Sequence, residues 1–231
     1  KPAFAYCIYL GYHLTQKLGY PDDTIRLRQH SPNEMAHYAD DAWDLEVKTQ
    51  QFGWVEICGI HDRTNYDIKR HSQYSNQNFE ISMGSDPKEK EIPQILEIAF
   101  GPDRILYTLL ETCFNVKHER IVLKLLPDLA PNTVAVFPLV RNKKEILKLS
   151  KDVHKTLIKN RIISFFDSSG SIGKRYRRQD ELGTPYCVTI DYDSLNDNTV
   201  TLRERDTMEQ KRVKISHLAK IIQQELTMKS D

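Results

Sequence analysis

Apolar and polar positions along the first half of the chain change period several times, and the changes fall at turn residues. Helical spacing predicts helices over 3–18, 34–48, 65–72 and 105–114. Extended spacing predicts strands over 24–30, 52–60, 79–83 and 95–100. The helix over 34–48 has a strong start signal, because Ser31-Pro-Asn-Glu supplies an N-cap, a proline at the first helical position and a carboxylate at N3. Residues 74–93 are polar and rich in turn formers, so they are predicted to form a loop or hairpin.

The pattern is more regular after Pro131. Strands are expected over 134–140, 162–167, 186–193, 199–206 and 210–215, and helices over 143–160, 172–182 and 216–228. This order, within about 100 residues, predicts a small open α/β sheet flanked by helices. Pro127, Pro131 and the polar run between them predict a linker. The chain is therefore expected to contain a first domain over 1–126, a linker over 127–131 and a second domain over 132–231.

Charge separates the two parts of the chain. Residues 1–131 hold 14 Lys and Arg against 19 Asp and Glu, a net charge of −5, whereas residues 132–231 hold 19 against 13, a net charge of +6. The formal charge of +1 for all 231 residues hides this asymmetry. Clustered positive charge is what the neutralisation of phosphates requires, so the second part is predicted to bind a polyanion.

The most specific chemical signal is the stretch from Asp167 to Pro185, where an apolar strand meets a basic helix. Ser169, Gly170 and Gly173 let backbone N–H groups approach an anion, and the helix N-terminus adds partial positive charge. A mononucleotide P-loop is excluded, because a serine stands where that motif needs its first glycine. A solvated basic helix is the alternative on local chemistry. The residues predicted to contact a phosphodiester chain are Asp167, Ser168, Lys174, Arg175, Arg177 and Arg178.

Other classes of protein find little support in the composition. No apolar run approaches the roughly 20 residues of a membrane span, and no signal-peptide cleavage site follows the apolar segment 4–14. The cysteines are far apart and form no CxxC pair, which argues against a zinc knuckle or a disulfide framework and fits a cytoplasmic location. The 8 histidines show no zinc-helix spacing, and no metal site is assigned.

Four sequence phrases carry a family resemblance. They are Arg28-Gln-His-Ser-Pro-Asn-Glu-Met-Ala-His-Tyr-Ala, Gly53-Trp-Val-Glu-Ile-Cys-Gly-Ile-His-Asp-Arg-Thr, Glu97-Ile-Ala-Phe-Gly-Pro-Asp-Arg and Asp167-Ser-Ser-Gly-Ser-Ile-Gly-Lys-Arg-Tyr. Together, and in this order, they closely resemble glycyl-tRNA synthetases of the archaeal and eukaryotic type, which are class II aminoacyl-tRNA synthetases. The resemblance covers essentially the whole chain. It implies an α/β (α+β) fold with the back half of an antiparallel catalytic sheet, followed by an anticodon-binding domain with a small mixed sheet.

The resemblance also implies roles for individual residues. Glu97 to Arg104 resembles the third class II motif, in which Arg104 is catalytic and forms the ATP site together with Glu97 and Gly101. Glu56, Glu97 and Ala99 stand where the family binds glycine. A buried ammonium group needs charge partners, so we expect the two carboxylates to project into one pocket. The alternative for Glu56 is an exposed strand-edge carboxylate.

Two features depart from the family pattern. The family usually reads Glu-Pro-Ser where this chain has Glu97-Ile98-Ala99, so a hydroxyl expected in the glycine pocket is missing, at a cost of about 0.5–1.5 kcal/mol. The first and second class II motifs are not visible, and the chain begins at Lys1 without a methionine, which indicates a longer natural protein. On its own the chain is not expected to complete adenylation.

Charged residues near these positions are interpreted as support. Arg26, Arg28 and Glu34 superficially resemble the second motif, but the resemblance places them after it, as framework around the active site. Asp62 and Arg63 follow a strand and are expected to brace the wall of the active site through a charged hydrogen bond.

The activity implied by the resemblance is that of a glycine–tRNA ligase. Such an enzyme uses ATP and Mg²⁺ to form glycyl-adenylate and transfers the glycyl group to the 3′ end of tRNA(Gly). The resemblance further implies a homodimer with no membrane association. The alternative is a non-catalytic relative that serves as a nucleic-acid-binding or polymerase-accessory subunit. Ala99 favours this alternative, whereas Glu56, Glu97 and Arg104 oppose it.

Overall fold

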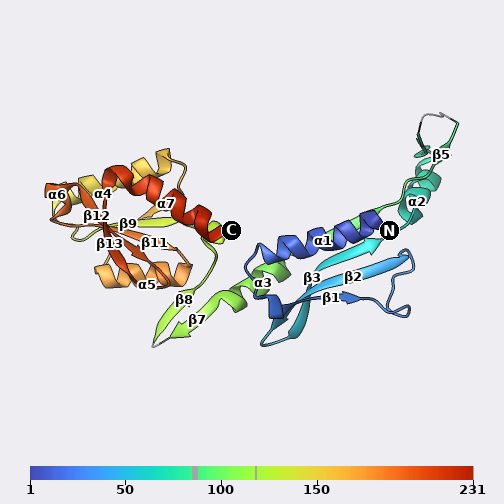
Figure 1. Cartoon of the computed structure of the whole chain (residues 1–231), viewed down its shortest axis with the longest axis horizontal. Helices are drawn as coiled ribbons and strands as arrows, with labels where there is room; N and C mark the ends of the chain where they lie inside the picture. Colours follow the sequence, from blue (N-terminus) through green and yellow to red (C-terminus); the bar gives the residue numbers. More distant parts are fainter. Residues whose placement is uncertain (85–87, 118, 231) are drawn as a thin grey trace. The chain divides into compact units, whose positions relative to one another are not determined.

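The chain folds into two compact units, Lys1–Thr112 and Cys113–Asp231, each described here by itself (Figure 1). The computed structural model describes residues 1–84, 88–117 and 119–230, and for 228–230 the backbone alone. The division between the units precedes the segment predicted as a linker, in which Pro127–Leu129 forms a 3-10 turn, η2. The domain limits expected from the sequence remain predictions.

A four-stranded antiparallel sheet forms the centre of the first unit, with the strand order β1-β2-β3-β6. This agrees with the antiparallel sheet expected from the resemblance. The strands are β1 (Ile25–Gln29), β2 (Asp41–Thr49), β3 (Gly53–Asp62) and β6 (Leu96–Phe100). The other elements are α1 (Pro2–Gln16), η1 (Asp22–Thr24), α2 (Tyr66–Ser75), the paired short strands β4 (Ile81–Ser82) and β5 (Lys90–Glu91), and α3 (Pro102–Cys113). The loop or hairpin predicted over 74–93 contains β4 and β5, and its residues 85–87 lie outside the described residues.

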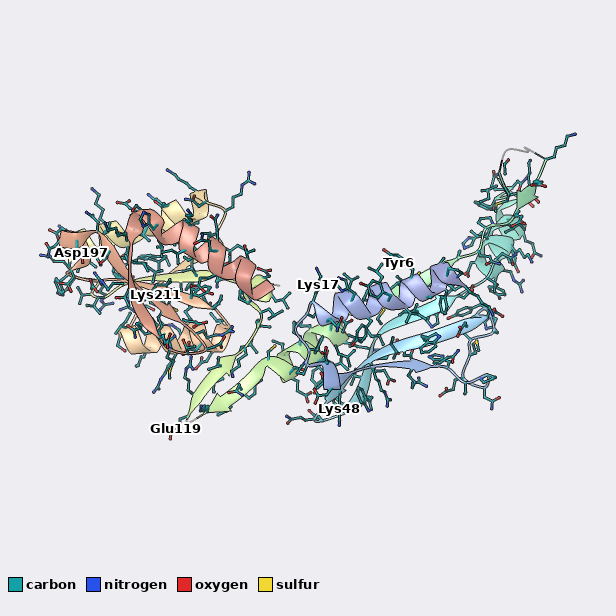
Figure 2. The ribbon with its side chains drawn as sticks, in the orientation of Figure 1. Tyr6, Lys17, Lys48, Glu119, Asp197 and Lys211 are labelled. Atoms are coloured by element: carbon teal, nitrogen blue, oxygen red, sulfur yellow. The ribbon has the colours of Figure 1, made fainter. Side chains whose placement is uncertain are left out.

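Helix α1 packs on β3 and β6 and covers an apolar face of this sheet (Figure 1). Cys58 and Ile60 of β3 are fully buried. Gly11 allows the close approach, because a Cβ atom there would lie 3.0 Å from the Ile60 side chain. Tyr6 lies on the outer side of the helix and is 61% exposed (Figure 2). The opposite face of the sheet is left for polar side chains.

The helix predicted over 34–48 is wrong, because residues 41–49 form strand β2. The capping contact itself exists, since the backbone N–H and the hydroxyl of Ser31 both donate to Glu34 at 3.1 Å. This contact forms a turn, but no helix follows it. From position 43 onward, apolar and polar residues alternate with a period of two and pair with strands on both sides, and this sheet pairing overrides the local helix signal.

A five-stranded mixed sheet forms the second unit, with the strand order β10-β9-β11-β12-β13. Strand β9 pairs in parallel with β10 and β11, whereas β12 is antiparallel to both of its neighbours. The strands are β9 (Val134–Pro138), β10 (Ser164–Phe166), β11 (Tyr186–Ile190), β12 (Thr199–Glu204) and β13 (Gln210–Lys214). The helices are α4 (Lys144–Lys159), α5 (Ile172–Leu182), α6 (Ser194–Asp197) and α7 (Ile215–Ser230). The predicted order of elements and the small mixed sheet are confirmed, with the short α6 as an addition.

A hairpin that the hydrophobic pattern did not predict joins this second unit. Strands β7 (Phe114–Lys117) and β8 (Arg120–Leu123) pair with each other, and β8 lies against α5. Asp180 of α5 accepts hydrogen bonds from Arg203 of β12 at 2.9 and 3.2 Å and from Arg120 of β8 at 2.8 Å. The side chain of Asp180 is only 3% exposed. This buried ion-pair network ties the hairpin and the sheet to one helix.

Gly183 ends α5 in the left-handed conformation, with a φ of 81°. A Cβ atom there would lie 2.9 Å from the carbonyl oxygen of Leu123. We expect Gly183→Ala to lower the free energy of unfolding by at least about 1 kcal/mol, since both the backbone conformation and the close approach oppose a side chain. Chemical denaturation of the chain measures this. Gly173→Ala is the matched control, because a Cβ on Gly173 meets nothing within 4 Å. Equal stability of the two variants would contradict the prediction.

Candidate functional site

On the polar face of the first sheet, arginines of β1 form ion pairs with carboxylates of β2. Arg28 donates to Asp44 at 2.7 Å and to Glu46 at 3.1 Å, and Arg26 also binds Glu46. Glu34 accepts from Arg28 at 3.2 Å. The two strand carboxylates are nearly buried, so their arginine partners are held by the sheet itself. These contacts support the interpretation of both arginines and Glu34 as framework.

Strand β3 contains a β-bulge that determines the direction of Glu56. Consecutive residues of β2 pair with Cys58 and Glu56, so the intervening Ile57 has no partner on β2. Regular alternation would put Glu56 on the face of Cys58, toward α1, but the extra residue of a bulge reverses the alternation. Accordingly, Oε1 of Glu56 lies 3.6 Å from the position of a Cβ atom on Gly59. Glu56 therefore projects from the polar face.

Strand β6 brings Glu97 to the same face. Glu97 lies opposite His61 and Ala99 lies opposite Gly59 in the antiparallel register. Residues directly opposite each other in such a pair project to one side of the sheet. Gly59 and Ala99 thus form a floor of small residues beside Glu56 and Glu97. The two carboxylates thus lie on one face of the sheet, which a shared pocket would require.

One oxygen of Glu97 is held by two donors. Oε2 accepts a hydrogen bond from Arg63 at 2.9 Å and one from Nδ1 of His61 at 3.2 Å. Within the part of the chain that the structure describes, Oε1 of Glu97 has no hydrogen-bond partner. The carboxylate is therefore fixed at one oxygen and available at the other.

Arg63 acts as the brace that the sequence predicted. Besides Glu97, it binds both carboxylate oxygens of Asp67, at 2.7 and 3.0 Å, and its guanidinium lies 4.0 Å from the ring centre of Tyr38. The hydrogen bonds to Asp67 and Glu97 raise the pKa of Arg63 far above its ordinary value. Asp62 has a different role from the one expected, because its carboxylate accepts the backbone N–H of Thr64 at 3.0 Å.

Arg104 lies in the first turn of α3, directly after β6. Its guanidinium donates to the Glu56 carboxylate at 2.9 Å and to the Glu56 carbonyl at 3.1 Å. The backbone N–H of Gly101 donates to the carbonyl of Ile57 at 2.9 Å, so the turn is anchored at the bulge. The Arg104 side chain is 54% exposed. A half-exposed guanidinium at the edge of this polar face can bind a phosphate.

In the second unit, the loop before α5 is organised by Asp167. Its carboxylate accepts the backbone N–H of Ser169 at 2.8 Å and a bond from Arg178. Burial alone would raise the pKa of Asp167, but these hydrogen bonds outweigh it and lower the pKa below its usual range. Ser171 caps the helix by accepting the Lys174 N–H at 3.4 Å. Asp167 thus shapes the loop, and its carboxylate is already engaged.

Arg175 does not have the exposed position expected of a phosphate ligand. It is 2% exposed, and its guanidinium donates to the carbonyl groups of Pro138, Leu139 and Gly170 at 2.6, 3.4 and 3.3 Å. The prediction of a direct contact to nucleic acid is therefore wrong for this residue. Its position on the inner side of α5 gives it a structural task, which is to join the loop to the end of β9.

The outer side of α5 remains positively charged. Lys174 and Arg177 are exposed, and Arg178 is 42% exposed although it also binds Asp167 and Ser169. Ser168, in the loop, is half-buried. Three cations at the N-terminal turns of one helix form a surface that suits a phosphodiester chain.

The structure adds His61 to the residues of the site. No pattern in the sequence assigned it a role, whereas the register places it opposite Glu97. Correct pairing of β3 with β6 would have identified His61, because a residue opposite a candidate carboxylate projects from the same face. Tyr38, stacked on Arg63, carried no comparable signal.

The described residues offer neither a metal-binding cluster nor a membrane-spanning helix, and two of the cysteines are unreactive. Over residues 1–84, 88–117 and 119–230, no cluster of three or more His, Cys, Asp or Glu side chains could hold a metal ion, and no helix is long and apolar enough to cross a membrane. Burial raises the pKa of Cys58 and of Cys187 to about 12, so both thiols stay protonated.

Comparisons with known proteins show which proteins the chain is similar to. Residues 133–225 match a family model described as an anticodon binding domain. A glycine–tRNA ligase of Methanocaldococcus jannaschii is 35% identical over 96% of this chain and 52% of its own length. Those of Borreliella afzelii and Treponema denticola are 44% and 41% identical over 88% and 91% of this chain, covering 46% and 48% of their own lengths. The chain thus spans about half the length of the curated relatives it matches.

Proposed function

We propose that this chain forms part of a glycine–tRNA ligase and corresponds to the C-terminal portion of the archaeal type. It is similar to glycine–tRNA ligases over most of its length and matches an anticodon binding domain over residues 133–225. The observation that carries the proposal is the shared face of Glu56, Glu97 and Arg104, which the β-bulge and the β3–β6 register create. By the same relationship we propose glycine, ATP and tRNA(Gly) as substrates, and a homodimer in the cytoplasm as the working form.

Glycine would bind above the floor formed by Gly59 and Ala99. The carboxylates of Glu56 and Glu97 provide two negative charges for the ammonium group of the amino acid, and such partners offset the cost of removing that charge from water. Ala99 offers only a methyl group where the family usually has a hydroxyl, so the carboxylates supply the polar contacts at this end of the pocket.

Arg104 would bind the phosphates of ATP. Attack of the glycine carboxylate on the α-phosphorus needs the triphosphate held in one orientation, and a guanidinium matches the charge and geometry of phosphate oxygens. Glu97 and Gly101 frame the same turn. Mg²⁺, when bound with ATP, would neutralise phosphate charge.

The direct test is the activity of the complete protein that carries this chain. Purified protein should catalyse glycine-dependent exchange of pyrophosphate into ATP and should charge tRNA(Gly). Exchange that does not respond to glycine would rule out the ligase. If glycine is not activated but tRNA still binds, the protein is the non-catalytic nucleic-acid-binding relative, which the methyl group of Ala99 favours.

Binding of tRNA by the outer side of α5 is a separate prediction. We expect Lys174→Ala, Arg177→Ala and Arg178→Ala each to weaken the binding of tRNA(Gly) by this chain by up to about tenfold at low salt. Each loss of a phosphate contact should also reduce the slope of log affinity against log salt concentration by about 1. A filter-binding or anisotropy titration at several salt concentrations measures both.

Lys151→Ala is the matched control, since it removes one exposed cation from α4. Loss of a phosphate contact should weaken the binding of cognate and non-cognate tRNAs equally, because phosphates carry no sequence information. If the three α5 variants bind tRNA like the Lys151 variant, the basic helix is only a solvated surface.

A further inference from the structure

His61 stands directly over the floor of the proposed glycine site. Its Cε1 atom would lie 2.8 Å, and its Nδ1 atom 3.6 Å, from a Cβ atom on Gly59. Carbon atoms in contact prefer about 3.5–4.0 Å, so the first distance is an overlap. The imidazole therefore occupies the space into which a side chain at this point of the floor would extend.

The same ring also holds Glu97. Nδ1 donates to Oε2 of Glu97 at 3.2 Å, and Arg63 donates to that same oxygen at 2.9 Å. Two donors on one oxygen limit rotation of the carboxylate, so its other oxygen keeps a constant direction. The His61 side chain is 18% exposed, which places the ring in the wall of the site. Its edge contact with His30, the residue that follows β1, has 6.2 Å between ring centres and supports that orientation.

The floor itself does not restrict the size of a bound amino acid. Gly59 has no side chain and its partner Ala99 has one methyl group. Exclusion of larger substrates must therefore come from a residue that rises above the floor. His61 does so, and it does so on the side where Glu97 would bind the ammonium group.

We propose that His61 is a specificity-determining residue that excludes amino acids with a side chain, and a positioning residue for Glu97. The inference rests on the proposed function. A pocket that only lacks favourable contacts for one extra carbon discriminates weakly, by roughly 10- to 200-fold, and steric overlap with a fixed ring strengthens that discrimination.

The experiment compares glycine with L-alanine in pyrophosphate exchange by the complete ligase. In His61→Ala, the ratio of kcat/KM for glycine to kcat/KM for alanine should fall at least about tenfold, because the excluded space opens. The KM for glycine should also rise, because Glu97 loses one donor. In His61→Asn, the side-chain amide can replace Nδ1 as a donor without filling the same space. That variant should keep a glycine KM closer to wild type and still lose discrimination.

His71→Ala, on the exposed face of α2, is the matched control. Thermal unfolding of each variant shows whether it is folded. A merely structural role would lower the rates with both amino acids by the same factor. An unchanged ratio in folded His61→Ala and His61→Asn enzymes would overturn this inference and leave the ligase function intact. Wild-type protein that fails to activate glycine would overturn both.

Discussion

Replacing Arg104 with alanine is expected to lower glycine-dependent pyrophosphate exchange by about 10- to 150-fold, which corresponds to the loss of a charged hydrogen bond of about 1.5–3 kcal/mol. Among the residues that the structure describes, the half-exposed guanidinium binds only Glu56, so in the absence of ATP its hydrogen bonds go to a group of the site itself. Phosphate oxygens would take over that interaction when ATP binds.

The Arg104→Ala change should affect the KM values for ATP and for glycine through different contacts. Arg104→Ala should raise the KM for ATP, and it also leaves the Glu56 carboxylate without its cation, which changes the KM for glycine. Arg104→Lys keeps the charge but loses the planar fork, so it should recover part of the activity. Arg70→Ala, on α2, removes an exposed arginine that lies against Tyr66 and serves as the control. Exchange kinetics near those of wild type in Arg104→Ala would rule out the ATP-binding role.

Asp180→Asn is expected to destabilise the second unit by about 3–5 kcal/mol, the range typical of breaking a buried ion pair by changing one partner. Arg203 is 7% exposed and binds Asp180 through two hydrogen bonds, so the change would leave a guanidinium in the interior without a counter-charge. Arg120 would lose the same partner, and with it one attachment of the β7–β8 hairpin to α5.

Chemical denaturation of the whole chain, followed by a probe of the second unit, measures this loss. Asp193→Asn removes the same charge from an exposed position and should change stability by less than about 0.5 kcal/mol. The hairpin of the Asp180 variant should also become more susceptible to limited proteolysis. A difference between the two variants below about 1 kcal/mol would show that the network is not important for stability.

The elements of the second unit follow closely from the sequence, because local and long-range preferences agree there. Helix α5 runs over the predicted residues 172–182, with a serine cap before it and Gly183 after it. In residues 31–49 the two preferences conflict. The contact between Ser31 and Glu34 forms, yet strand pairing on both sides determines the structure of the residues that follow.

The site was predictable in its residue types but not in its geometry. The resemblance pointed to Glu56, Glu97 and Arg104, and the structure brings them together. Spacing could not show that Arg175 turns inward, because four cations close together in a helix cannot all lie on one side of it. The contribution of His61 depends on which residue of β6 lies opposite it, and register is a property of the folded sheet.

The bulge at Ile57 means that the site depends on the number of residues in β3 as well as on their identity. That number counts relative to β2, because one residue inserted into β2 opposite Ile57 would restore even pairing and would turn Glu56 toward α1, into the layer that holds Cys58. Every side chain assigned to the site would still be present in such a sequence, and Arg104 would have lost its partner. A single-codon insertion in β2 should therefore move the Glu56 carboxylate to the other face of the sheet without altering any of the residues assigned to the site.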